Sequence, residues 1–515
     1  MDTIAQRRDG RARGTARAFR IAEQKTVTLR FGVIMLAFLS IAASAQDRRS
    51  GNTVYAPSAC PTIVASPAAD TIDKLVAAQM RRERIPAVQL AVSRAGRVRT
   101  RVYGYSDLEH CVRADANSIF AIGSVSKQLT AYATLRLVEA GKLALDDSIT
   151  KYLPESRPAW NGITIRHLLT HTSGIRDYGG DDPVYPQLSL DRRAEYTADS
   201  LVRFFASAPL NFRPGSEFAY SNTGYYVLSI VLERVAGMPF ADVMRTLVYE
   251  PLGMRLATAW NPRIILLNLA TGYGTYDDTL QRGLYRGASA GRWGGDTGLL
   301  ATAADLARFQ WELLHPRFLS AAHVRLMTSR DTLSDGTTVL YGFGIQPTDV
   351  RGVPMWMHSG AFVTGYTAFV ASFPTRDLAV AIVANSHTAQ PWLLVMNALP
   401  LLDPALRAVP ASRVRDADTL RTARLRRLFE GDSTALPMTP EFGRFQYGVV
   451  RRRFREAHFQ SFTFLGCDDL RHSTAALPRG VTSECYFRVE SSRGVLVLGV
   501  YFTADGAVAD VRTKG

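Results

Sequence analysis

The stretch Ser124-Val125-Ser126-Lys127, continued by QLTAYATLRLVE up to Glu139, is the most informative part of this 515-residue chain. Apolar side chains occur on most sides of Lys127–Glu139, which predicts a buried helix. Ser124 and Lys127 are three residues apart, so the hydroxyl and the amine point the same way from one helical turn. A lysine whose pKa is lowered by burial can accept the serine proton, which allows nucleophilic catalysis without histidine. A helix-capping serine beside a surface lysine would give the same four residues.

Predicted strands lie on both sides of a long helical region, which extends from about residue 150 to residue 330. Before it, Asp70–Arg84 has helical periodicity, and a hairpin joins Val88–Ser93 to Arg97–Tyr103. One antiparallel sheet completed from both ends of this part of the chain is the simplest arrangement. We therefore expect an α+β fold, with an antiparallel sheet flanked by helices and an all-helical insertion. The later predicted strands are Val339–Ile345, Met355–His358, Tyr366–Phe373 and Leu378–Asn385.

The last hundred or so residues are expected to form a second, smaller α+β domain. The apolar pattern is interrupted near 402–415, so we place the main domain at residues 70–402 and the accessory domain at residues 410–515. An amphipathic helix is predicted over Ala417–Phe429. The Arg-rich run Arg451–Arg455 is expected on a solvated strand edge or helix face rather than on a surface for acidic polymers. The predicted strands are Ser461–Leu465, Glu484–Val489, Gly494–Phe502 and Ala507–Val511.

The first 45 residues have the pattern of a secretory signal. A basic stretch precedes the uncharged apolar run Phe31–Ala43, which ends in Ala43-Ser44-Ala45. The apolar run is short for a membrane-spanning helix. We expect removal of residues 1–45, a linker over residues 46–69, and a periplasmic or secreted protein. The alternative is a retained leader that anchors the chain in the inner membrane.

The four cysteines are expected to form two disulfides if the protein is exported. The expected bridges are Cys60–Cys111 and Cys467–Cys485. The spacing does not fit a zinc site, which needs closely paired cysteines. Four buried free thiols are the alternative.

The formal net charge of +15 raises the question of a nucleic-acid partner. Part of this charge belongs to the expected leader and part to the Arg-rich accessory domain. The chain has no groove-reading motif, and export also argues against nucleic acid. The expected partner is a small-molecule or peptide substrate, with fragments of the cell wall among the candidates. The sequence leaves the oligomeric state open, and membrane contact is expected only with a retained leader.

Two further motifs follow in a fixed order: Tyr220-Ser221-Asn222, and then His358-Ser359-Gly360 with Ala361 after it. The series S-x-x-K, Y-x-N and H-x-G resembles the serine β-lactamase and penicillin-binding peptidase superfamily. With tyrosine in its second motif, the chain resembles one branch of this superfamily. That branch contains class C β-lactamases, D-alanyl-D-alanine carboxypeptidases, D-aminopeptidases and class VIII-type esterases. Residues 163–174, 218–224 and 294–302 also resemble this branch, and the likeness extends over roughly residues 70–400.

The resemblance implies a role for each motif residue. Ser124 is expected to be the nucleophile, Lys127 its base, and Tyr220 the residue that shares the proton and passes it to the leaving group. Asn222 is expected to donate its amide to the substrate. The backbone N–H groups of Ser124 and Ala361 would form the oxyanion hole, and His358, Ser359 and Gly360 would line the strand beside the substrate. The resemblance implies neither a metal nor a cofactor.

The residue at position 358 departs from the lactamase form of its motif, which carries a lysine. Histidine is mostly neutral above its ordinary pKa of about 6.5, so a fixed positive charge for a β-lactam carboxylate is missing. We therefore expect an exported serine hydrolase that cleaves an ester or an amide of a peptide, a D-amino acid or a small ester through an acyl-enzyme. The alternatives are a β-lactamase proper, and a penicillin-binding or peptidoglycan-sensing module that is acylated without turnover.

Two other patterns imitate catalytic motifs. Gly287-Ala288-Ser289-Ala290-Gly291 fits G-x-S-x-G, but its neighbours lack the strand and helix that a nucleophile elbow needs. His167 and His171 have the spacing of zinc ligands, but Leu168 occupies the place of the glutamate. These histidines are expected to pack or cap helices.

Overall fold

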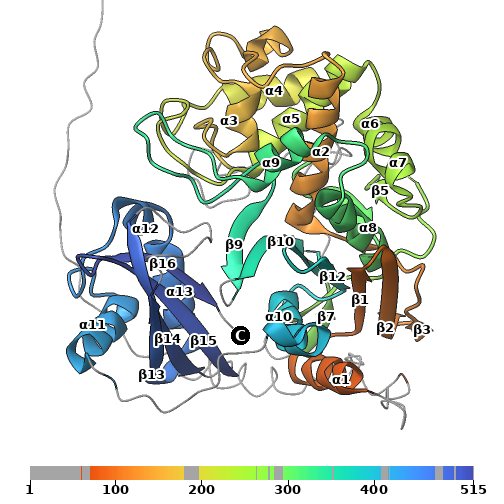
Figure 1. Cartoon of the computed structure of the whole chain (residues 1–515). Helices are drawn as coiled ribbons and strands as arrows, with labels where there is room; N and C mark the ends of the chain where they lie inside the picture. The colour runs from red at the N-terminus through yellow and green to blue at the C-terminus, as the bar shows by residue number, and fades with distance from the viewer. Residues whose placement is uncertain are drawn as a thin grey trace, which may run out of the picture. The chain divides into compact units, whose positions relative to one another are not determined.

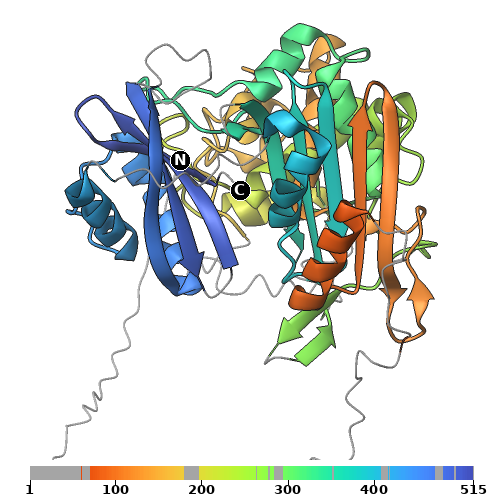
Figure 2. The ribbon, with the colours of Figure 1, turned by 60° about the horizontal axis from the view of Figure 1, so that its bottom comes forward.

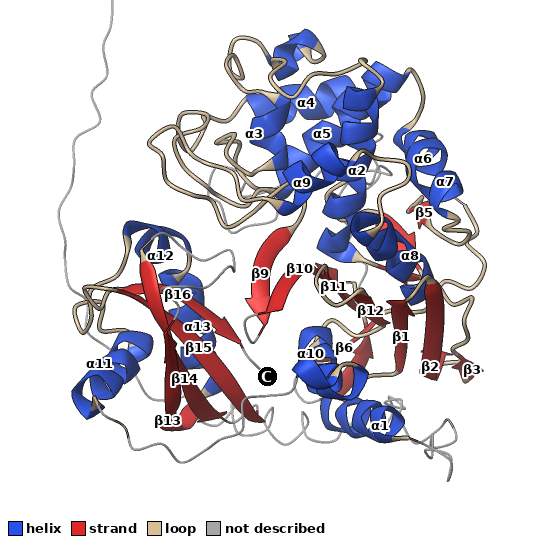
Figure 3. Ribbon diagram, in the orientation of Figure 1, coloured by secondary structure: helices blue, strands red, loops and turns tan. Residues whose placement is uncertain are grey.

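The computed structural model describes residues 60, 70–178, 197–261, 264–276, 279–283, 294–350, 353–362, 364–406, 416, 418–469, 480–491 and 494–513. Figures 1 and 3 show the order of the helices and strands. The expected leader, the expected linker apart from Cys60, and the Gly287–Gly291 motif lie outside the described residues. In the part of the chain that is described, none of the helices has the length and hydropathy needed to span a bilayer.

The main element is a seven-stranded antiparallel sheet, and it draws strands from both sides of the helical region as expected. Its order is β3-β2-β1-β12-β11-β10-β9. The predicted hairpin is present, with β1 paired to β2, and β1 pairs with β12 so that Leu90 faces Ile382. The strands are β1 (Ala87–Arg94), β2 (Arg97–Asp107), β3 (Val112–Arg113), β9 (Gln346–Val350), β10 (Val353–Phe362), β11 (Tyr366–Phe373) and β12 (Leu378–Ala384).

Helices cover both faces of this sheet, so its central strands are buried throughout. Figure 2 shows α1 (Thr71–Glu83) and α10 (Pro391–Leu402) on one face. Alternate residues of β12 point to opposite faces of the sheet. Val380 and Ile382 belong to the core beneath α10, whereas Ala381 and Val383 belong to the larger core that includes α8 (Ala303–Leu314). Both faces of this strand are apolar, which explains its continuous run of hydrophobic residues.

The segment between β3 and β9 is mainly helical. Its core helices are apolar on several sides, and α2 has eleven buried residues from Ser126 to Leu137. Short sheets join β4 (Phe120–Ala121) to β8 (Leu299–Ala301) and β5 (Thr258–Ala259), and β6 (Tyr273–Tyr276) to β7 (Thr279–Arg282). The other helices are α2 (Ser126–Glu139), α3 (Ile165–Leu169), α4 (Ala198–Ala206), α5 (Asn222–Ala236), α6 (Phe240–Met244), α7 (Glu250–Leu252) and α9 (Ala321–Thr328).

The C-terminal residues form a four-stranded antiparallel sheet with its own hydrophobic core. The strands follow in sequence order: β13 (Phe459–Asp469), β14 (Val481–Ser491), β15 (Gly494–Thr503) and β16 (Val508–Thr513). Leu425, Leu428 and Phe429 of α11 (Thr419–Glu430) are buried in this core. Two helices, α12 (Pro440–Phe445) and α13 (Tyr447–Ala457), were not predicted; Arg451–Arg455 lies in α13. The Tyr501 hydroxyl hydrogen-bonds the Asp349 carboxylate of β9, with 2.9 Å to each oxygen.

The predicted strand Val339–Ile345 is wrong, because the chain is irregular there and β9 begins only at Gln346. Two glycines give the physical reason. A Cβ on Gly342 would lie 2.2 Å from the Met327 carbonyl oxygen, and Gly344 has a φ of +72° with the Lys127 carbonyl oxygen 2.6 Å from its Cβ position. The segment therefore follows the start of α2 closely, in a conformation that a strand does not allow.

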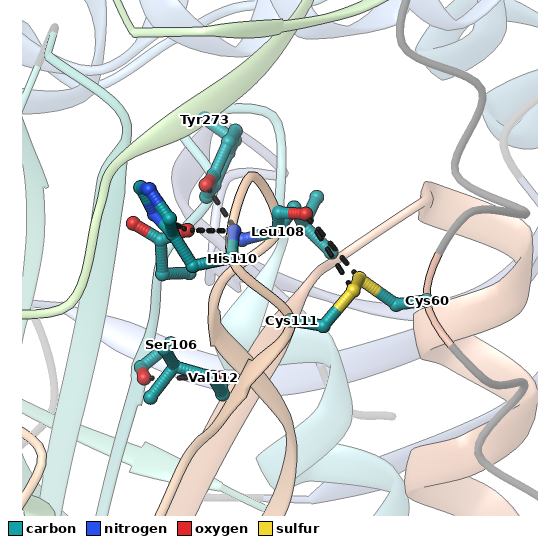
Figure 4. Close-up of a disulfide and its surroundings, with 8 residues drawn as sticks. Cys60, Ser106, Leu108, His110, Cys111, Val112 and Tyr273 are labelled. Carbon is teal, nitrogen blue, oxygen red and sulfur yellow. Dashed lines mark hydrogen bonds and ion pairs between the residues drawn. A yellow bond between two sulfur atoms is a disulfide. The ribbon is translucent and has the colours of Figure 1, made fainter.

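Both expected disulfides are present, Cys60–Cys111 and Cys467–Cys485. The first joins Cys60, which comes before α1 in the sequence, to the turn that precedes β3, as Figure 4 shows. At that turn the Leu108 backbone N–H donates to the Tyr273 hydroxyl oxygen at 2.8 Å. The bridge thus connects the N-terminal end of the described chain to the edge of the main sheet.

Asn385 follows β12 and is fully buried. Its Oδ1 accepts from the Ala87 backbone N–H at 2.6 Å, and its Nδ2 donates to the carbonyl oxygens of Tyr105 (3.1 Å) and Thr271 (3.0 Å). One side chain therefore satisfies backbone groups of β1, β2 and the loop before β6.

Asn385→Ala is expected to lower the free energy of unfolding by about 2–4 kcal/mol, because it leaves buried backbone groups without partners. Urea unfolding followed by circular dichroism measures this loss. The exposed Asn161→Ala is the matched control, and it is expected to change stability by less than about 0.5 kcal/mol. Equal stability of the two variants would contradict the role given to Asn385.

Candidate active site

Ser124 and Lys127 meet at the start of α2, as the sequence predicts. Ser124 lies in the 3₁₀ turn η2 (Gly123–Val125), which runs directly into α2. Lys127 Nζ is 3.1 Å from Ser124 Oγ. The Lys127 side chain is 0% exposed, so its amine is held among protein groups rather than in solvent.

Two further oxygen atoms contact the Lys127 amine. Asn222 Oδ1 lies 2.8 Å from Nζ, and the backbone carbonyl oxygen of Asp296 lies 2.9 Å from it. Asn222 is the first residue of α5, and Asp296 precedes β8. One side-chain amide oxygen and one backbone carbonyl oxygen thus hold the amine, and they come from two segments that are distant in sequence.

Tyr220 of the second motif packs beside this lysine. Its ring centroid lies 4.8 Å from Lys127 Nζ and 4.2 Å from the ring centroid of His171, with the two rings tilted by 33°. The Tyr341 and His358 rings lie within 6.4 Å of the same ring. The structure therefore brings the residues of all three predicted motifs into one cluster, with Tyr220 and Lys127 close enough to interact electrostatically.

The third motif lies on the edge of β10, directly against η2. β9 pairs only with Val353–Met357, so the edge from residue 358 onward is not covered by β9. A Cβ on Gly360 would lie 2.0 Å from the Ile122 carbonyl oxygen, and a Cβ on Gly123 would lie 2.6 Å from the Ala361 carbonyl oxygen. These two glycines allow the backbones to touch, so Ala361 is next to Ser124 as an oxyanion hole would require.

His358 is turned away from solvent, whereas Ser359 and Ala361 are exposed. His358 Nδ1 lies 2.6 Å from the Ser359 carbonyl oxygen, so Nδ1 carries the hydrogen and Nε2 accepts from the Tyr341 hydroxyl at 2.9 Å. Burial lowers the pKa of His358 to about 3. The imidazole is therefore neutral at physiological pH.

Comparison with known proteins gives the family of this chain. Residues 72–394 match the sequence family described as Beta-lactamase, which is more than half of the chain.

The chain belongs to the beta-lactamase family.

Two curated relatives have different printed names. Penicillin-binding protein 4* of Bacillus subtilis (strain 168) is 31% identical over 301 residues, which cover 55% of this chain and 64% of that protein. Esterase EstB of Burkholderia gladioli is 38% identical over 196 residues, which cover 36% of this chain and 50% of that protein. The chain thus spans half to two thirds of the length of these relatives.

A solved structure has the same fold. The one described as EstCE1, a hydrolase with promiscuous acyltransferase activity, has a TM-score of 0.52 and 25% identity. The alignment covers 61% of this chain and 93% of that one.

Within this beta-lactamase-family site, sequence reasoning missed several residues that touch the motif residues. Asp177 and Tyr178 follow the H-T-S-G-I stretch, and Asp296 lies in a stretch already noted for its family likeness. Tyr341 lies in the segment predicted as a strand. Their convergence depends on contacts between distant segments, which local periodicity does not report.

The two histidines at zinc-ligand spacing have structural roles, as expected. His167 caps α3: its Nδ1 accepts from the Thr164 backbone N–H at 3.2 Å. His171 Nδ1 accepts from the Ser221 backbone N–H at 3.1 Å. His171 therefore holds the loop that carries Tyr220 and Asn222.

Gly360→Ala is expected to reduce the rate of Ser124 acylation at least about 100-fold, because the new Cβ must push β10 away from η2. Labelling with a fluorescent penicillin, followed over time, measures this rate. Gly443→Ala, whose Cβ would meet no atom within 4 Å, is the control and should label at the wild-type rate. Wild-type labelling of the Gly360 variant would show that the close approach is not needed.

The pH dependence of stability should report the buried imidazole of His358. The unfolded chain protonates this histidine near its ordinary pKa of about 6.5, whereas the folded chain does so near pH 3. The contribution of the neutral His358 to the free energy of unfolding is present above pH 6.5 and is lost as the pH falls toward 3. Over this range the free energy of unfolding falls by about 1.4 kcal/mol per pH unit.

His358→Gln is expected to reduce the slope of the free energy of unfolding against pH by the amount due to one proton between pH 6 and pH 4, because glutamine does not titrate. Urea unfolding at several pH values gives the slope. An unchanged slope in the variant would contradict a neutral, buried His358.

Proposed function

We propose that this chain is a serine hydrolase that cleaves esters, and also amides, through an acyl-enzyme on Ser124. The observation that carries the proposal is the set of contacts around Lys127. A neutral amine has two hydrogens and one lone pair. The oxygens of Asn222 and Asp296 can only accept, so they take both hydrogens and leave the lone pair for the Ser124 hydroxyl.

In the proposed reaction, Ser124 Oγ attacks the substrate carbonyl carbon while its proton passes to Lys127 Nζ. The negative charge that forms on the carbonyl oxygen is stabilised by the backbone N–H groups of Ser124 and Ala361. Tyr220, beside the protonated amine, gives its phenolic proton to the leaving alcohol or amine as the bond to it breaks, and the proton on Lys127 replaces it, so that the amine is neutral again. Water then attacks the acyl-enzyme carbonyl while its proton passes to Lys127. That proton returns to Ser124 Oγ as the acyl–oxygen bond breaks and the acid is released.

The neutral His358 supports substrates without a carboxylate near the reacting carbonyl. Where the lactamase motif has a lysine, this chain has an imidazole whose pKa is about 3. Its one N–H donates to the Ser359 carbonyl oxygen, and its lone pair accepts from the Tyr341 hydroxyl. A fixed cation that would attract a carboxylate is therefore missing at this position. The similarity to a protein named as an esterase favours the same substrate class.

We further propose that the protein works outside the cytosol, in the periplasm or after secretion. Two disulfides support this, because such bonds persist in oxidising compartments. The signal-like pattern of residues 1–45 supports the same location.

A panel of substrates tests the function. Wild type and Ser124→Ala are compared on p-nitrophenyl butyrate, on a matched p-nitrophenyl ester with a free carboxylate, on a D-alanyl-D-alanine peptide and on a chromogenic cephalosporin. We expect hydrolysis of the uncharged ester with the highest kcat/KM, and a loss of at least about 1,000-fold in Ser124→Ala.

Full esterase activity in Ser124→Ala would refute the mechanism. Labelling by a fluorescent penicillin without turnover of any substrate would instead favour a penicillin-binding module, the function named in the Bacillus relative. Efficient cephalosporin hydrolysis would favour a β-lactamase.

A further inference from the structure

The two oxygens that hold the Lys127 amine are themselves fixed by consecutive residues of one loop, Asp177 and Tyr178. Asp177 contacts Asn222, and Tyr178 contacts Asp296. The two acceptors are therefore coupled through a single short segment, although Asn222 and Asp296 come from different parts of the chain.

The Asp177 carboxylate accepts from both the backbone N–H and the side-chain amide of Asn222, at the start of α5. Its Oδ1 accepts from the Asn222 backbone N–H at 2.8 Å, and its Oδ2 accepts from Asn222 Nδ2 at 3.1 Å. A carboxylate can only accept hydrogen bonds, so the Asn222 amide must turn its NH₂ group toward Asp177. The Asn222 carbonyl oxygen then has to face Lys127, as observed at 2.8 Å.

Tyr178 fixes the second acceptor. Its backbone N–H donates to Thr223 Oγ1 at 2.9 Å, and its hydroxyl hydrogen-bonds Asp296 Oδ2. The Asp296 side chain is 1% exposed, and Thr297 Oγ1 also donates to Oδ2 at 3.1 Å. Holding this buried carboxyl fixes the peptide whose carbonyl oxygen accepts from Lys127.

The ring of Tyr178 is itself held in place, so the contact to Asp296 is not a loose surface bond. The ring stacks on Phe205 at 6.1 Å and meets Tyr226 edge-on at 6.2 Å. Burial, with the charge of Asp296 next to it, raises the pKa of the Tyr178 phenol well above its ordinary value, so the hydroxyl keeps its proton and remains a donor.

We propose that Asp177 and Tyr178 are positioning residues of the acylation step: they orient the two acceptors of Lys127 and thereby direct its lone pair at Ser124. This inference rests on the proposed acyl-enzyme function. Neither residue touches Ser124 or the reacting atoms in this arrangement; each acts through the group that it holds. Loss of either residue should slow acylation; loss of Tyr178, which acts only on the Asp296 side, should leave substrate binding unchanged.

Asp177→Asn is the sharpest test, because it changes hydrogen-bonding capacity with little change in shape. The new amide can donate to Asn222, which then turns its carbonyl toward position 177 and its NH₂ toward Lys127. A neutral Lys127 amine would accept from this NH₂ group through its lone pair, which would then point at Asn222 instead of Ser124; a protonated amine would face another donor and move away. We expect the acylation rate constant to fall about 10- to 100-fold.

Tyr178→Phe and Asp296→Ala form a double-mutant cycle on the second acceptor. Each single variant is expected to slow acylation about 10-fold, and the double variant no more than either single one, because the two side chains form one contact. Stopped-flow acylation by a p-nitrophenyl ester at several concentrations separates the rate constant from binding. Additive losses in the cycle would contradict a shared role.

Asp147→Asn is the matched control. Asp147 also accepts from a backbone N–H, that of Ala144 at 2.9 Å, and from the Tyr152 hydroxyl at 2.5 Å, but it does not contact the motif residues. It is expected to acylate at the wild-type rate. Wild-type acylation of Asp177→Asn, or an equal loss in Asp147→Asn, would overturn the proposal.

A crystal structure of Asp177→Asn gives a readout that does not depend on turnover. We expect Lys127 Nζ to shift away from Ser124 Oγ; retention of the present 3.1 Å contact, with Nζ in place, would overturn the positioning role. Failure of wild type to acylate at Ser124 would refute the proposed function, whereas a normal wild type with an unaffected Asp177 variant would refute only this inference.

Discussion

An amine buried away from solvent needs hydrogen-bond partners, and the rest of this site depends on how the Lys127 amine obtains them. Its contacts come from Ser124 on the same helical turn, from Asn222, which is 95 residues away in sequence, and from Asp296, which is 169 residues away. The helical region has to fold around α2 so that these groups meet. The same contacts determine where the lone pair of a neutral amine points, so stability and chemistry share one arrangement.

The sheet packs closely against the turn and helix that carry Ser124 and Lys127, and the points of closest approach are glycines. Gly360 and Gly123 let β10 touch η2, and Gly344 lets the chain before β9 pass the Lys127 carbonyl. Any side chain at these points would separate the sheet from α2. A rigid, doubly covered sheet thus holds the backbone of Ala361 against Ser124, which is the precision that an oxyanion hole needs.

The electrostatics of the site differ from those of the lactamase form of the motif. His358 is neutral because it is buried, and it spends its hydrogen bonds on Ser359 and Tyr341. The Asp177 carboxylate accepts from Asn222, and the Asp296 carboxyl group hydrogen-bonds Tyr178 and Thr297. A carboxylate on the substrate finds no cation at position 358. This distribution underlies the proposed preference for uncharged esters.

The family motifs, the helix over Lys127–Glu139, the β1–β2 hairpin and the strands Tyr366–Phe373 and Leu378–Asn385 could be predicted from the sequence, because each leaves a local signal in spacing or periodicity. The two disulfides were predicted from the grouping of the four cysteines and the expectation of export. The tertiary structure alone decided that Val339–Ile345 is not a strand, that residues 440–457 form two helices, and that Asp177, Tyr178, Asp296 and Tyr341 belong to the site. Their roles arise from hydrogen bonds and packing between segments far apart in the chain, and such contacts leave no periodic pattern in the residues that make them.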